Sequence, residues 1–149
     1  MKKSIFLLFF IPVFFACNQN QSKVETPDRN SVHDASSTEL SLNNGAKWKA
    51  DSVTNHNVIR LKTTAGMFRV QPFPSIDNYQ LLGSDLSNDL NILIEQCKMQ
   101  GEDHKALHRW LEPTLHLSNE LKTVTDTSRA KEIFDSVDVR IDAYPNYFE

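Results

Sequence analysis

Side chains that can bind a metal gather in one short stretch of the chain. Residues 97–108 contain one cysteine, one methionine and two histidines, namely Cys97, Met99, His104 and His108. Thiolate and thioether sulfur favour copper(I), whereas imidazole nitrogen suits copper, zinc or haem iron. His104 and His108 are four residues apart, so on a helix they lie one turn apart on the same face. The cluster therefore predicts a site for copper(I) or, after it, zinc, with non-covalent haem as a third alternative.

The path of the chain decides whether these four side chains can meet. On one continuous helix over residues 76–112, Cys97, His104 and His108 share a face, but Met99 points away from it. A break at Gly101 instead places the end of one helix beside the start of the next, at an axial separation of about 8 to 10 Å. All four side chains can then approach one ion, so the four-ligand site requires a break.

Each of these residues also has a purely structural explanation. Cys97 continues the apolar stripe of its own helix, where a small buried cysteine is common. His104 and His108 lie at the edge of the next apolar stripe, a position typical of half-exposed surface histidines. The sequence leaves open whether Cys97 is a core thiol or a ligand, and whether the histidines are a surface pair or a site.

Helical periodicity dominates the chain from residue 45 onwards. Apolar residues recur at spacings of three and four in four segments, separated by short connections. This pattern predicts an all-α fold, an up-and-down four-helix bundle. The predicted inward-facing residues are Val58, Leu61, Ala65 and Phe68, then Tyr79, Leu82, Leu86, Leu90, Leu93 and Cys97, then Leu107, Trp110, Leu111, Thr114, Ser118 and Leu121, and finally Ala130, Ile133, Phe134, Val137, Ile141 and Tyr144.

Several residues predict where these helices begin and end. Ser75 is a suitable N-cap for the second helix, and Asp126 or Thr127 for the fourth. Gly101 suits the left-handed conformation just past a helix end. Pro145 is predicted to stop the last helix, since proline lacks the backbone donor that a helix needs.

The N-terminal segment has the layout of an export signal. Lys2 and Lys3 precede an apolar run over residues 5–15, which is about 16 Å long as a helix and covers only half of a bilayer core. The run ends in Phe14-Phe15-Ala16-Cys17, which resembles the lipobox of bacterial lipoproteins. The resemblance implies that residues 1–16 are a signal peptide that is removed. It also implies that Cys17 carries acyl chains of the palmitate type, which attach the protein to a membrane.

The composition divides the rest of the chain into a stalk and one domain. Residues 17–44 combine the lipidated cysteine with a polar segment that has too few apolar residues to fold, and some 27 such residues reach about 30 Å. Residues 45–149 are enough for one small domain. Because Asn18 supplies no acidic retention signal, an outer-membrane anchor is favoured over an inner-membrane one. The domain would then lie in the periplasm or at the cell surface.

Charge and missing motifs exclude several functional classes. The formal charge is −3, and it becomes −5 once Lys2 and Lys3 are removed, which argues against nucleic acid as a partner. The sequence contains no Cys-x-x-Cys-His haem motif, glycine-rich phosphate loop, Gly-x-Ser-x-Gly elbow or paired Glu-x-x-His motif. With no nucleophile beside an identifiable base, an enzyme is the least supported class.

Two short sequence patterns in the domain resemble patterns of known proteins. They are Gly-x-x-Trp-x-x-Asp at residues 45–51 and Cys-x-Met-x-Gly-x-x-His-x-x-x-His-x-Trp-Leu-x-Pro at residues 97–113. In these patterns the domain is similar to small uncharacterised helical envelope lipoproteins of Gram-negative bacteria, a resemblance that implies no activity. We expect Trp48 to pack over one end of the bundle, although a tryptophan between lysines can also mark a partner surface.

These observations together give one functional expectation and one alternative. The expectation is a membrane-tethered, non-catalytic binding or interaction module of the cell envelope, with the lipid bilayer and an envelope protein as partners. The alternative is a metal-handling or haem-binding bundle that uses the cluster at residues 97–108.

Overall fold

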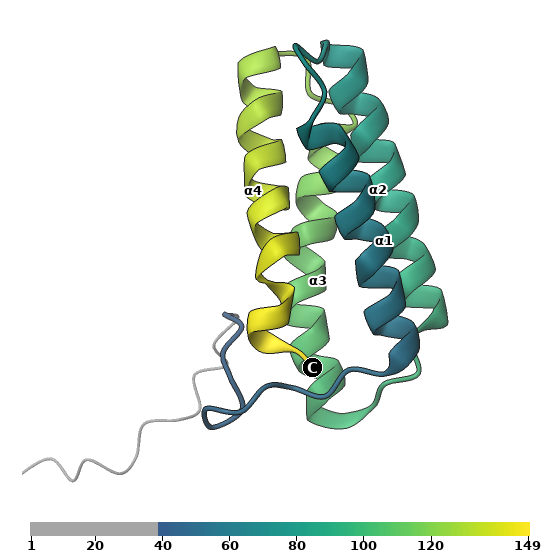
Figure 1. Cartoon of the computed structure of the whole chain (residues 1–149), viewed down its shortest axis with the longest axis vertical. Helices are drawn as coiled ribbons and strands as arrows, with labels where there is room; N and C mark the ends of the chain where they lie inside the picture. The colour runs from purple at the N-terminus through teal and green to yellow at the C-terminus, as the bar shows by residue number, and fades with distance from the viewer. Residues whose placement is uncertain (1–38) are drawn as a thin grey trace, which may run out of the picture. The chain divides into compact units, whose positions relative to one another are not determined.

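The computed structural model describes residues 39–149, which form four helices. These are α1 (Ser52–Arg69), α2 (Ile76–Gln96), α3 (Gly101–Leu121) and α4 (Thr127–Tyr147). The predicted signal peptide, Cys17 and most of the predicted stalk lie outside the described residues. The helices run alternately up and down (Figure 1), and within residues 39–149 the only β-type pairings are two isolated bridges. The predicted all-α four-helix bundle is confirmed.

The core is built from the predicted apolar stripes. Each helix packs mainly against the next one in the chain, and α4 also contacts α1 and α2. Every residue predicted to face inward is buried except Cys97, which is half-buried. Phe68, Tyr79 and Phe134 cluster near the α1–α2 connection, and Trp110, Tyr144 and Phe148 cluster near the opposite end. The bundle therefore has one continuous core with an aromatic cluster at each end.

The predicted N-caps are present. Ser75 caps α2 in a capping box with Asn78, in which each side chain bonds the backbone of the other residue. Asp126 caps α4 by accepting a hydrogen bond from the backbone N–H of Arg129 at 2.8 Å. Asp51 caps α1 in the same way, accepting from Thr54 N–H at 2.6 Å. Short polar side chains thus fix the start of three helices.

The prediction that Pro145 stops the last helix is wrong. Helix α4 passes through Pro145 and ends at Tyr147, with the backbone N–H of Phe148 donating to the carbonyl of Tyr144 at 3.1 Å. The helix tolerates the absent backbone N–H of Pro145 because residues 147–149 form backbone hydrogen bonds with the segment before α1. Trp48 N–H donates to the carbonyl of Tyr147, and Glu149 N–H donates to the carbonyl of Trp48. This tertiary pairing extends the helix by more than half a turn past the proline.

The segment before α1 runs across one end of the bundle (Figure 1) and forms hydrogen bonds with the elements there. Trp48 is buried there, as expected, and its indole N–H donates to the carbonyl of Ser41 at 2.6 Å. The second oxygen of the Asp51 carboxylate accepts from Lys98 N–H at 3.1 Å, and Lys49 N–H donates to Asp103 at 3.0 Å. The Gly-x-x-Trp-x-x-Asp pattern thus has a structural role, since Trp48 and Asp51 join this segment to α4 and to the α2–α3 connection.

Part of the predicted stalk lies within the described residues. Residues 39–44 precede the segment just described, and Leu40 is partly buried against the core. Asn43 and Ala46 pair through two backbone hydrogen bonds of 2.9 Å, with Gly45 in the left-handed conformation at φ +89°. Residues 39–44 therefore belong to the same compact unit as residues 45–149.

Candidate functional site

The chain breaks between α2 and α3, as the four-ligand metal site requires. Helix α2 ends at Gln96, Cys97 and Gln100 are extended, and Gly101 begins α3 with φ +69°. Cys97 is the C-cap of α2, and its backbone N–H donates to the carbonyl of Leu93 at 3.0 Å. Both Cys97 and Met99 are half-buried and pack against the hydrophobic core. The sulfur-bearing residues thus lie at the end of the bundle, on the connection itself.

The structure brings the two histidines together. The Nε2 atoms of His104 and His108 lie 3.1 Å apart, and the ring centroids are separated by 4.7 Å. On the far side of the pair, His108 Nδ1 lies 3.4 Å from a carboxylate oxygen of Glu112, one further turn along α3. Both rings are partly exposed, so the pair is accessible from solvent.

The four predicted ligands do not converge as one cluster. Within residues 39–149, no group of three or more His, Cys, Asp or Glu side chains is arranged to hold a metal ion. Cys97 instead lies near Tyr144, whose hydroxyl donates to the side-chain oxygen of Asn55 at 3.0 Å. Burial raises the pKa of Tyr144 far above its ordinary value, and nearby Asp51 and Cys97 raise it further. Among the predicted ligands, His104 and His108 are the two for which the structure shows a direct contact within residues 39–149.

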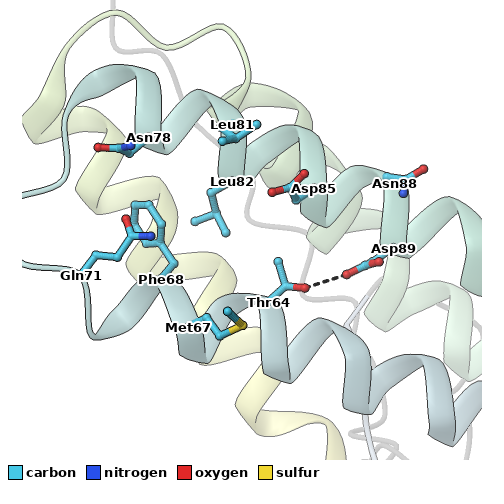
Figure 2. A pocket seen from close by; sticks show the side chains of 10 residues that line it. All are labelled: Thr64, Met67, Phe68, Gln71, Asn78, Leu81, Leu82, Asp85, Asn88 and Asp89. Atoms are coloured by element: carbon cyan, nitrogen blue, oxygen red, sulfur yellow. Dashed lines mark hydrogen bonds between the residues drawn. The ribbon is translucent and has the colours of Figure 1, made fainter.

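A groove between α1 and α2 has no counterpart in the sequence prediction. Its volume is about 350 Å³. Figure 2 shows its walls, with Thr64, Met67, Phe68 and Gln71 on the α1 side and Asn78, Leu81, Leu82, Asp85, Asn88 and Asp89 on α2. Apolar side chains, amides and carboxylates all line it. Such a mixture is typical of surfaces that hold an apolar group while fixing its orientation with a few polar contacts.

The two carboxylates of the groove differ in their surroundings. Asp89 is buried, and its oxygens accept hydrogen bonds from Arg60 and from the Thr64 hydroxyl, each at 2.8 Å, so it joins α1 to α2. Asp85 is exposed, and within residues 39–149 it forms neither an ion pair nor a hydrogen bond with another side chain. Asp85 is therefore the groove carboxylate that is available to a partner.

The two most exposed large apolar side chains of α1 and α2 line the groove. Met67 is 68% exposed and Leu81 is 62% exposed, one on each side. Val70 and Phe73 follow in the connection, and Phe73 is fully exposed. The backbone of Phe73 has φ +52°, which is rare for a bulky residue. Isolated apolar residues outside the inward stripes were the signal in the sequence that could have indicated this surface.

Comparison with known proteins adds no relatives. No protein family, curated protein or solved structure matches the chain. Among the helices of residues 39–149, none is long and apolar enough to cross a membrane.

Proposed function

We propose that this protein is a lipid-anchored, non-catalytic binding module of the bacterial cell envelope. Acylated Cys17 holds it on a membrane, preferably the outer one, and the helical bundle offers the α1–α2 groove to a protein partner. The observation that carries the proposal is the pair of large, mostly exposed apolar side chains, Met67 and Leu81, on opposite rims of that groove. Large exposed apolar side chains on both sides of a groove can anchor a bound protein segment.

The chemistry of the groove favours a particular kind of partner. Phe68, Leu82 and the two rim residues suit an apolar anchor side chain, and the amides of Asn78 and Asn88 suit backbone peptide groups. Asp85 has no cationic partner in the described part of the chain, so it favours a lysine or arginine on the bound segment. The partner is therefore a protein segment that presents an apolar anchor next to a basic residue.

The groove lies away from the point where the described chain enters the bundle. The described chain enters the bundle at the end where α1 begins, whereas the groove lies toward the end where α1 stops (Figure 1). Helix α1 has 18 residues and so is about 27 Å long. The groove and the point where the described chain enters therefore lie toward opposite ends of the bundle.

Replacing Leu81 by glutamate tests this role. In a mild detergent extract of the cell envelope, we expect the parent protein to migrate in a complex larger than itself on a native gel. We expect Leu81→Glu to migrate as the free protein, because a charge on the rim cannot be desolvated against an apolar anchor. Leu81 is largely exposed, so the fold should persist, with unchanged helicity by circular dichroism as the check.

Ile94→Glu is the matched control for this experiment. Ile94 is also an exposed apolar residue of α2, but it lies 13 residues from Leu81, or about 20 Å along the helix. This variant should migrate in the complex like the parent. A parent that migrates alone, or two variants that behave alike, would contradict the proposal.

A further inference from the structure

We infer that His104 and His108 form a binding site for one divalent transition-metal ion, zinc or copper(II), on the exposed face of α3. This inference is independent of the proposed groove function. It rests on the 3.1 Å separation of the two Nε2 atoms, on the accessibility of both rings and on a carboxylate behind one of them.

The separation of the two nitrogens matches what a shared ion needs. Zinc–imidazole bonds are about 2.0 to 2.1 Å long, so two imidazole nitrogens on one tetrahedral ion lie about 3.3 Å apart. Two adjacent nitrogens on a square-planar copper(II) ion lie about 2.9 Å apart by the same geometry. The observed 3.1 Å falls between these values. The distance between the two nitrogens is therefore compatible with two bonds to one ion.

The helix holds the pair in place before any ion arrives. Residues at i and i+4 of α3 lie on one face, and α3 is fixed in the bundle by Ala106, Leu107 and Trp110, which are buried on its other face. The His108 side chain is 47% exposed, so an ion can reach it without opening the core. Water can occupy the coordination positions that the two histidines leave open.

Glu112 gives the site the support that metal-binding histidines usually have. Its carboxylate oxygen lies 3.4 Å from His108 Nδ1, one small adjustment from a hydrogen bond. A carboxylate that accepts the proton of the outer ring nitrogen leaves the lone pair on Nε2, which is the atom that faces His104. The site on α3 thus consists of two ligands, His104 and His108, and one supporting carboxylate, Glu112.

The structure also changes the metal that the site is expected to prefer. The sequence prediction placed copper(I) first because of the soft sulfur atoms of Cys97 and Met99. In the structure these two residues pack against the core, and within residues 39–149 no third His, Cys, Asp or Glu side chain completes the histidine pair. Two imidazole nitrogens without sulfur favour zinc and copper(II) over copper(I).

Titration of the purified full chain with zinc chloride, followed by calorimetry and by thermal unfolding, tests the inference. We expect one ion per chain and a rise in the unfolding midpoint with zinc, since an ion that binds the folded helix stabilises it. His104→Ala should weaken this binding by more than about tenfold, and Glu112→Gln by about tenfold. Both side chains lie on the surface, so the variants should unfold at the parental midpoint without zinc.

His116→Ala is the control, since His116 is an exposed histidine of the same helix outside the pair. It should bind zinc like the parent. The inference is overturned if the parent shows no zinc binding, or if His104→Ala and His116→Ala bind the ion equally well.

Discussion

Replacing Gly83 by alanine should lower the free energy of unfolding by about 1 to 3 kcal/mol, the usual range for overpacking an interior. A Cβ atom at residue 83 would lie 2.7 Å from the backbone nitrogen of Lys122, and 2.9 Å from the carbonyl carbon of Leu121 and from the carbonyl oxygen of Ser118. These are backbone atoms at the end of α3 and cannot rotate away. Helices α2 and α3 would therefore have to move apart at this contact.

Gly66→Ala is the matched control for this substitution. Gly66 also lies inside a helix, but a Cβ atom there would meet nothing within 4 Å. We expect this variant to gain about 0.4 to 1 kcal/mol, because alanine loses less chain entropy than glycine on folding. Urea denaturation of the two variants and the parent measures both effects. Equal stability of Gly83→Ala and the parent would contradict the close approach of α2 to α3.

Replacing Cys17 by serine should abolish acylation of the protein. A serine hydroxyl cannot form the thioether that joins a lipobox cysteine to its lipid, so the loss of label should be complete. Growth with an alkyne analogue of palmitate, followed by fluorescent coupling, measures the effect directly.

Cys97→Ser is the control for the labelling experiment. Cys97 is the only cysteine in the described part of the chain, where it caps the end of α2 and packs against the core. We expect this variant to keep the full label. Equal labelling of Cys17→Ser and the parent would show that the membrane anchor is not at Cys17.

The sequence was a good guide to the bundle because burial follows the helical period. A side chain that recurs every three or four residues must share one face, and that face is the only one that four packed helices can cover. Cys97 departs from the pattern because its helix ends one residue earlier, so the stripe does not extend to it. Pro145 departs because pairing of the chain end with Trp48 stabilises the last turn against the loss of one backbone donor.

The candidate sites were less predictable than the bundle, because most of their contacts join residues that are distant in the sequence or depend on the path of a loop. The His104/His108 pair is local, so a spacing of four residues was enough to predict that the rings meet. The position of Cys97 relative to them depends on the path of residues 97–100, which periodicity does not determine. The groove depends on the register between two helices, since Met67 and Leu81 are 14 residues apart and become neighbours only when α1 packs on α2.

Site-specific photo-crosslinking in living cells tests the central claim most directly. A photoreactive amino acid at position 81 should give one dominant protein adduct, and the same probe at position 94 should give none. Asp85→Asn should weaken the adduct from position 81, because the proposed partner presents a basic residue to that carboxylate. Equal adducts from positions 81 and 94, adducts with lipid alone, or no adduct from position 81 would contradict the assignment of the α1–α2 groove as a protein-binding site.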